Sequence, residues 1–220
     1  LYFSQSKEIM NSQHGREIQC TFNYNENQIL RILDIAYNFA SERSKKLCLV
    51  LKKDGLKSMT DLWLDLMVKL HKKYKSVNWE FLDIDNAAYQ LVARPEAFDV
   101  VVAPNMLGDI LADLCAVHLG SRGLSYSGNF SDNSLSVFQT GHGAAYDLIG
   151  KKTANPIGQI LSLTMLLKFQ FKLDKEANII IDAIGNTLSQ GFRTPDINSN
   201  KTASITTQQM TNEIIKNLDK

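Results

Sequence analysis

Short apolar runs that alternate with stretches of helical periodicity constrain the fold of this chain most strongly. The strand-like runs lie at 47–51, 79–84 and 98–103. The helical stretches lie at 25–43, 60–70, 86–92 and 106–119. A run such as LCLVL or FDVVVA is typical of a parallel strand that is buried on both faces. Strands that alternate with helices predict βαβ units, and therefore an α/β fold with a parallel or mixed sheet covered by helices.

The second half of the chain follows a different pattern. Glycines at 120, 123 and 128 predict loops, and Val137-Phe138 predicts a brief strand. Asn155-Pro156 predicts a helix start, with asparagine as the N-cap and proline in the first helical position. Further helices are expected near 174–190 and 206–219, and the mostly polar residues 1–24 are expected to form a loop or an extended arm.

Composition narrows the class of protein. A chain of 220 residues that is 44% hydrophobic can form one large domain or two small ones. Its 24 basic and 23 acidic residues favour neither nucleic acid nor an anionic membrane as a partner. No apolar run reaches the ~18 residues of a membrane span, and no signal peptide is visible, so a cytoplasmic protein is expected. Cys20, Cys48 and Cys115 form no CxxC pair and are expected to be buried thiols.

Two aspartates at helical spacing predict a metal site. Asp109 and Asp113 share one face of the helix that follows the strand at 98–103, and Asp85 ends the strand before it. Like charges one turn apart repel, and a divalent cation such as Mg²⁺ or Mn²⁺, which prefers carboxylate oxygens, would offset this repulsion. The ordinary alternative is that acidic residues in a first helical turn interact with the helix dipole.

A glycine-flanked histidine predicts a ligand-binding loop. Gly141 and Gly143 flank His142, and the helix start at Asn155-Pro156 follows closely. Glycines let the backbone approach a ligand, and a helix N-terminus suits phosphate or amide contacts. The dinucleotide fingerprint GxGxxG is absent from the sequence. The alternative interpretation is a flexible loop followed by a capped helix.

Residues 98–168 resemble the β-decarboxylating dehydrogenases, the family of isocitrate, isopropylmalate, homoisocitrate and tartrate dehydrogenases. NMLGDILADL is similar to the family's metal-binding helix, and DIDNAAYQLV with RPEAFDVVV to the segment before it. HGAAYDLIGKKTANP is similar to its adenosine-binding loop, and GFRTPDI to a motif near its C-terminus. These blocks keep the family's order and approximate spacing. The resemblance, closest to the 3-isopropylmalate dehydrogenases, implies a two-domain α/β fold with mixed sheets flanked by helices. That fold is expected to be incomplete here, with the N-terminal third absent.

The resemblance also implies roles for individual residues. The implied metal ligands are Asp85, Asp109 and Asp113. The implied cofactor loop consists of His142, Gly143, Ala144, Ala145, Asp147 and Asn155. The implied catalytic residues are Tyr2 and Lys53. The family's NADP-dependent members often carry lysine at the position of Asp147, and a carboxylate there favours NAD. Alternatively, Tyr2 belongs to an expression-tag scar, and Lys53 is an ordinary solvated lysine beside Lys52 and Lys57.

The chain departs from the family pattern near Lys53. The family usually reads VDKAN where this chain reads LKKDG, so Lys52 replaces an aspartate and Gly55 an asparagine. The adenosine loop normally follows Glu-Pro, and here it follows Gln139-Thr140. The change at Gly55 places the identity of the substrate, and activity itself, in question.

The function implied by the resemblance is oxidative decarboxylation of a 2-hydroxy diacid similar to 3-isopropylmalate, with NAD and Mg²⁺ or Mn²⁺. The alternatives are action on isocitrate, tartrate or another hydroxy diacid, and a catalytically silent regulatory subunit. A homodimer is implied, because the family's lysine reaches in from the partner subunit. Residues 1–120 would form the smaller, dimer-forming domain with an arm, and helices 25–43 and 106–119 would supply its apolar surface. Residues 121–220 would form the C-terminal part of the larger, cofactor-binding domain.

Overall fold

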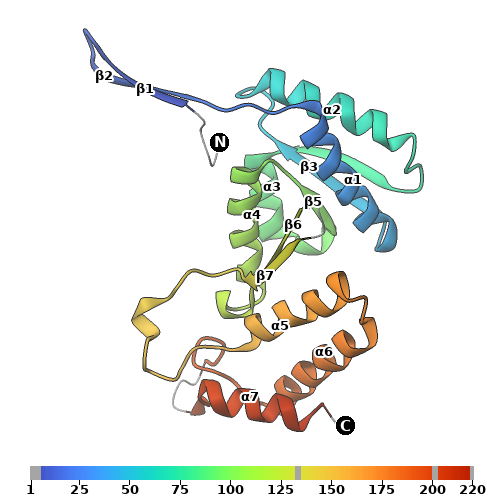
Figure 1. Cartoon of the computed structure of the whole chain (residues 1–220), viewed down its shortest axis with the longest axis vertical. Helices are drawn as coiled ribbons and strands as arrows, with labels where there is room; N and C mark the ends of the chain where they lie inside the picture. Colours follow the sequence, from blue (N-terminus) through green and yellow to red (C-terminus); the bar gives the residue numbers. More distant parts are fainter. Residues whose placement is uncertain (1–5, 132–134, 200–202, 219–220) are drawn as a thin grey trace. The chain divides into compact units, whose positions relative to one another are not determined.

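The computed structural model describes residues 6–131, 135–199 and 203–218, which belong to two compact units (Figure 1). Unit 1 is Leu1–Cys115 and unit 2 is Ala116–Lys220. The division between them falls within helix α4 (Asn105–His118).

Unit 1 is built around a parallel sheet of three strands in the order β4-β3-β5. The strands are β3 (Lys46–Leu51), β4 (Asn78–Asp83) and β5 (Val100–Val102). The helices of this unit are α1 (Glu26–Glu42), α2 (Lys57–His71), α3 (Ile84–Ala93) and the first part of α4. The α/β prediction is confirmed, because each strand is followed by a helix and the sheet is parallel.

The central strand β3 is buried on both faces, which explains its uninterrupted apolar sequence. Leu47, Leu49 and Leu51 pack into a cluster with residues of α1 and α2. Cys48 and Val50 point to the opposite face, where they pack with residues of α3 and α4. Since side chains of a strand alternate between faces, helices on both sides require apolar residues at every position.

Helix α1 uses its apolar face within its own unit. Asn25 caps the helix together with Gln28, as the sequence predicts. Leu33 and Tyr37 are fully buried against the sheet and α2, and the Tyr37 hydroxyl donates to the Met67 carbonyl at 3.2 Å. Most of the apolar face of this helix therefore lies in the core of unit 1, although Ile32 is 40% exposed. The expectation that the helix supplies apolar surface for dimerisation stays a prediction.

The N-terminal segment forms a two-stranded antiparallel hairpin. Its strands are β1 (Ser6–Ser12) and β2 (Gly15–Thr21), and Gly15 turns the chain with a φ of 103°. Every residue of β2 is exposed, so the extended arm expected from the sequence is a ribbon. Of the three cysteines, Cys48 is buried as expected, whereas Cys20 on the ribbon and Cys115 on α4 are exposed.

Asp99 joins the end of α1 to the start of β5. Its carboxylate accepts hydrogen bonds from Arg43 Nε at 2.6 Å and from the Ser44 amide and hydroxyl at 2.9 and 2.6 Å. The Asp99 side chain is 10% exposed. Partial burial raises the pKa of Asp99, but the hydrogen bonds from Arg43 and Ser44 lower it more, so the pKa lies below its usual value.

Replacing Asp99 with asparagine is expected to lower the free energy of unfolding by about 1.5–3 kcal/mol, because hydrogen bonds to a charged group are lost. The pKa of Asp99 is lower in the folded than in the unfolded chain. Its contribution is therefore complete above pH ~4 and is lost as the pH falls through the folded-state pKa. Urea unfolding at neutral pH and at pH ~3 should show a smaller difference between the two proteins at the lower pH. As a control, Asp61→Asn breaks an exposed pair with Lys57 and should cost less than about 1 kcal/mol. Equal losses in both variants would contradict the role of Asp99.

The described part of unit 2 contains a second hairpin, followed by longer α-helices. Its elements are β6 (Tyr126–Phe130), β7 (Ser136–Thr140), α5 (Ile157–Met165), α6 (Asp174–Ser189) and α7 (Thr207–Lys216). Helix α5 contacts the hairpin and α6, and Ile157, Ile184 and Met210 belong to the core between the helices. The strand at Val137-Phe138 was expected, whereas β6 was expected to be a loop.

Shorter helical segments complete the fold. They are η1 (Pro95–Ala97), η2 (Arg122–Leu124), η3 (Tyr146–Leu148) and the π-helical η4 (Leu166–Gln170). In the described parts of the chain, no helix combines the length and apolarity that crossing a membrane requires.

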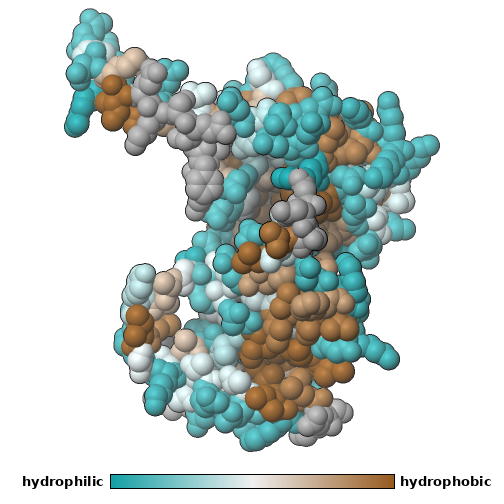
Figure 2. Space-filling model, viewed as in Figure 1, coloured by the Kyte–Doolittle hydropathy of each residue, from teal (hydrophilic) through white to brown (hydrophobic). Residues whose placement is uncertain are grey.

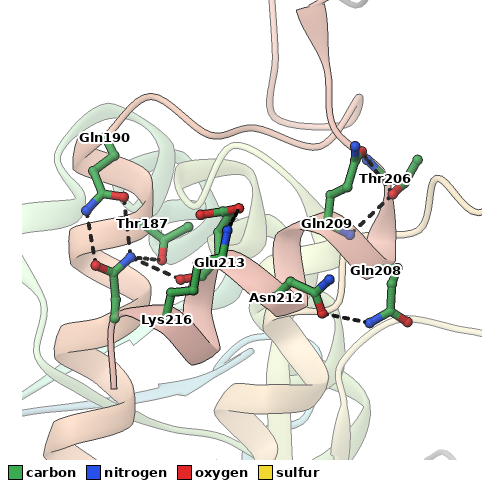
Figure 3. A network of polar contacts seen from close by, with 9 residues as sticks. Thr187, Gln190, Thr206, Gln208, Gln209, Asn212, Glu213 and Lys216 are labelled. Atoms are coloured by element: carbon green, nitrogen blue, oxygen red, sulfur yellow. Dashed lines mark hydrogen bonds and ion pairs between the residues drawn. The ribbon is translucent and has the colours of Figure 1, made fainter. Parts of the chain in front are cut away.

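Polar contacts attach α7 to α6. Figure 3 shows Thr187 of α6 and Gln190, the C-cap residue of that helix, facing the C-terminal end of α7. There the Asn217 amide donates to Thr187 Oγ1 at 3.0 Å and its carbonyl accepts from Gln190 Nε2 at 3.0 Å. At the other end of α7, Thr206 and Gln209 form a capping box. These contacts fix both ends of the last helix.

Candidate functional site

The predicted catalytic and metal-binding residues of unit 1 follow the carboxyl ends of its strands. Lys53 follows β3, Asp85 follows β4, and α4 with Asp109 and Asp113 follows β5. The carboxyl ends of parallel strands share one edge of a sheet, where α/β proteins bind ligands. Asp85 was expected at the end of a strand. It lies instead in the first turn of α3, because β4 ends at Asp83 and the helix begins at Ile84.

Two contacts join the segment after β3 to the start of α3. The Lys53 backbone N–H donates to Asp83 Oδ1 at 2.8 Å, and the Lys53 side chain is exposed. The neighbouring Lys52 ammonium donates to Asp85 Oδ1, also at 2.8 Å. This hydrogen bond lowers the pKa of Asp85, which keeps the carboxyl group ionised.

Among the residues that the structure describes, Asp85, Asp109 and Asp113 do not form one metal-binding group within a single copy of the chain. Asp109 and Asp113 are both exposed on α4. Over residues 6–131, 135–199 and 203–218, no group of three or more His, Cys, Asp or Glu side chains could hold a metal ion. The chemistry of the two aspartates fits Mg²⁺ or Mn²⁺, since both supply hard oxygen donors from one helix. Tyr2, the predicted catalytic tyrosine, lies outside the described residues.

A pocket of about 540 Å³ lies in unit 2. Its lining residues are Ser121, Arg122, Gly123, His142, Gly143, Ala144, Ala145, Leu148, Ile149, Ala154 and Asp196. Four of the predicted cofactor residues are among them, namely the run from His142 to Ala145. Asp147 and Asn155 do not line the pocket but directly adjoin lining residues. A pocket of this size suits a small molecule or part of a cofactor.

The loop that lines the pocket has a defined conformation. His142 Nδ1 lies 2.8 Å from the Gly143 carbonyl oxygen, which can only accept, so Nδ1 is the donor in this contact. Ala145 has a left-handed backbone with a φ of 48°, which is uncommon for a residue other than glycine. The chain then enters η3, which places Asp147 in an exposed position between two lining residues, Ala145 and Leu148.

Asp196 connects three separate segments around the pocket. Its carboxylate accepts from Ser121 Oγ at 2.5 Å, from Thr194 Oγ1 at 2.6 Å and from the Asn155 amide at 3.1 Å. Asn155 Oδ1 in turn accepts from the Ile157 N–H at 3.0 Å. The prediction of Asn155 as N-cap is wrong by one residue, because α5 begins at Ile157 and its N-cap residue is Pro156. Asp196 was not among the predicted site residues, and its only sequence signal was the motif GFRTPDI.

Two glycines allow the pocket wall to approach α5. A Cβ atom on Gly158, in the first turn of α5, would lie 2.7 Å from the Gly123 carbonyl oxygen and 2.8 Å from that of Ser125. A Cβ on Gly123 would lie 2.8 Å from Asp196 Oδ2. Both distances are too short for a real contact. The close approach of residues 121–125 to α5 therefore depends on the absence of side chains at Gly123 and Gly158.

Comparison with known proteins places these features in context. A family model described as isocitrate/isopropylmalate dehydrogenase matches residues 1–214. The 3-isopropylmalate dehydrogenase of Aquifex aeolicus is 39% identical over 220 residues, which are 100% of this chain and 60% of that protein. The 3-isopropylmalate dehydrogenase of Buchnera aphidicola subsp. Cinara cedri is 40% identical over 195 residues, which are 89% of this chain and 53% of that protein. The chain thus spans about 60% of the length of such relatives.

Solved structures resemble the chain over nearly its whole length. The isocitrate dehydrogenase of Methylococcus capsulatus superimposes with a TM-score of 0.89 at 27% identity, covering 98% of this chain and 63% of that one. The TT0538 protein of Thermus thermophilus superimposes with a TM-score of 0.87 at 29% identity, covering 98% of this chain and 43% of that one.

Proposed function

Because this chain belongs to the isocitrate/isopropylmalate dehydrogenase family, we propose that the whole protein oxidatively decarboxylates a 2-hydroxy diacid with NAD and a divalent metal ion. The observation that carries the proposal is the pocket of unit 2, because four predicted cofactor residues line it. The relatives named 3-isopropylmalate dehydrogenase favour 3-isopropylmalate as the substrate. Isocitrate, tartrate and other hydroxy diacids are the alternatives.

The pocket suits the adenosine half of NAD. Ala144, Leu148 and Ile149 offer apolar surface for a flat base, and the His142 ring offers its second nitrogen, Nε2, for a hydrogen bond. Asp147 adjoins this lining and is exposed. Its carboxylate would accept hydrogen bonds from the ribose hydroxyls and would repel a 2′-phosphate, which favours NAD over NADP.

The residues of unit 1 would carry the proton transfers. Bound Mg²⁺ or Mn²⁺ would supply Lewis acidity at the substrate hydroxyl and carboxylate, held by Asp85, Asp109 and Asp113. Lys53 would accept the hydroxyl proton as NAD receives the hydride. After the oxidised product loses CO₂, Tyr2 would donate a proton to the carbon that carried the carboxylate.

The site would be shared between two copies of the chain. Because the described residues of a single copy do not bring these three carboxylates into one metal-binding group, Asp85 and Lys53 of one copy would meet Asp109 and Asp113 of the other. Exposed apolar residues on α3 and α4 offer a surface for this contact. In unit 1 they are Tyr89 (73% exposed), Val92 (57%) and Ile110 (51%). Residues 1–120 would then be the dimer-forming part of the protein, and residues 121–220 part of its cofactor-binding domain.

A dehydrogenase assay of the whole protein tests the proposal. With NAD and Mn²⁺ we expect NADH formation from 3-isopropylmalate at a higher kcat/KM than from isocitrate or tartrate. A chelator should abolish turnover, and Mn²⁺ should restore it. Preference for another hydroxy diacid would change the proposed substrate and leave the proposed reaction intact. No turnover with any of them, in a protein that is folded and dimeric, would instead indicate a silent regulatory subunit.

A further inference from the structure

A lysine ammonium contacts the carboxylate that would be the third metal ligand. Lys52 Nζ lies 2.8 Å from Asp85 Oδ1, with side chains that are 40% and 71% exposed. Leu51 of β3 pairs with Asp83 of β4, so these adjacent strands end at the same edge of the sheet. Lys52 and Asp85 follow closely after these strand ends. The contact is therefore set by the strand register, and solvent ions can reach it.

The segment after β3 favours this position of Lys52. The Leu56 N–H donates to the Lys52 carbonyl at 2.9 Å, which closes a turn. A Cβ atom on Gly55, inside this turn, would lie 3.3 Å from Lys52 Cγ. Glycine at position 55 leaves space for the aliphatic stem of Lys52. The two departures from the family pattern, Lys52 and Gly55, thus lie in the same turn.

The pair joins an ammonium group to a carboxylate, and Lys52 Nζ occupies one oxygen of that carboxylate, Oδ1. An ammonium group and a divalent cation both bind carboxylate oxygens, so they compete for Asp85. A metal ion that binds Asp85 must therefore displace Lys52 or bind close to its positive charge.

We propose that Lys52 is an internal counter-cation for Asp85, which orients this carboxylate in the absence of metal and weakens divalent-metal binding by competing for it. The inference rests on the proposed function, since it takes Asp85 as a metal ligand. Lys52 stands where the family usually has an aspartate, and this replacement reverses a charge beside the proposed metal site. Weaker metal binding is the consequence that we infer. Metal affinity would then be set in part by a residue that is not a ligand.

Calorimetric titration of the whole protein with Mn²⁺, in the absence of substrate and NAD, tests this inference. Lys52→Ala is expected to bind Mn²⁺ about three- to tenfold more tightly than the unmodified protein, because an adjacent positive charge is removed. Lys52→Gln, which keeps most of the stem, should show a similar gain. Lys57→Ala is the matched control. It removes the same charge from another exposed Lys–Asp pair on α2 and should leave the affinity within about twofold.

The same titration with Asp85→Asn separates a local effect from a general charge effect. If Lys52 acts through Asp85, Lys52→Ala should bring no gain when Asp85→Asn is already present. A gain that persists there, or equal affinities of the unmodified protein and Lys52→Ala, would overturn the inference and leave the proposed metal site intact. If none of the proteins with an intact Asp85 binds Mn²⁺, the proposed metal site fails and the inference fails with it.

Discussion

Replacing Lys53 with methionine in the whole protein is expected to lower kcat by about 10²- to 10⁴-fold, with a much smaller change in KM. Methionine keeps an unbranched side chain of similar length but cannot accept the proton of the substrate hydroxyl, and a positioned base contributes a rate factor of this size. Initial rates with NAD and Mn²⁺ at saturating substrate measure the effect. Lys75→Met, at another exposed position of unit 1, is the control and should keep full activity. A loss below about fivefold would remove Lys53 from the proposed mechanism.

The same variant shows whether the site is shared between two copies. If Lys53 of one copy works with Asp109 of the other, co-expression of Lys53→Met with Asp109→Asn leaves one intact site in each heterodimer. Random pairing makes half of the dimers heterodimers, so roughly a quarter of the unmodified activity should return, although each variant alone is inactive. If both residues act within one copy, each site in the mixture has one defect and no activity returns.

Replacing Asp147 with lysine is expected to shift the ratio of kcat/KM for NAD to that for NADP by about a hundredfold or more towards NADP. The carboxylate would no longer accept from the ribose hydroxyls, and hydrogen bonds to a charged group contribute about 1.5–3 kcal/mol. The new ammonium would also attract the 2′-phosphate of NADP. Steady-state kinetics with each cofactor measure the ratio.

A matched charge reversal controls for long-range electrostatics in this comparison. Asp182 is exposed on α6 and does not line the pocket, so Asp182→Lys should leave the cofactor preference unchanged. If the unmodified protein already uses NADP better than NAD, the interpretation of Asp147 is wrong. If both variants shift the ratio equally, the effect belongs to net charge and not to the loop.

The sequence predicted the sheet of unit 1 well, because a strand that is buried on both faces is apolar at consecutive positions. This pattern can be recognised without knowing which strands it pairs with. Leu47–Leu51 is apolar at every position, and the structure shows why. The ribbon of β1 and β2 leaves no such signal, because β2 is exposed throughout and its strands pair only with each other. Helix α2 begins at Lys57, three residues before the expected Thr60, and no side chain caps that start.

The candidate site was predicted where its residues are close in sequence. His142 to Ala145 form one run and line one pocket. Asp196 meets Ser121 across 75 positions, and Lys52 meets Asp85 across 33, so neither contact leaves a local pattern. Of the two helices expected to supply apolar surface for a dimer, α1 packs most of its apolar face into unit 1, whereas α4 keeps Ile110 and Val117 exposed. Helix α3, which was not expected to, carries exposed Tyr89 and Val92. Periodicity identifies an apolar face but not what covers it.

Exposed apolar side chains also gather in unit 2. Figure 2 shows hydrophobic atoms over α5 and α6, where Leu163, Ile179 and Ile181 are exposed. An apolar surface of this kind is typical of a contact with further protein.

The unequal lengths of the strands in unit 1 bear on the order in which this unit folds. Six residues of β3 pair with six residues of β4, and the crossover that connects these strands contains only α2. Strand β3 pairs with β5 over only three residues, after β4 and α3 have intervened. Closing the shorter loop costs less chain entropy and gives more hydrogen bonds, so β3, α2 and β4 form the favoured nucleus. We expect strand β5 and α4, which carries Asp109 and Asp113, to dock after this nucleus. A metal ion bound by these aspartates and by a second copy would therefore stabilise the last part of this sheet to dock.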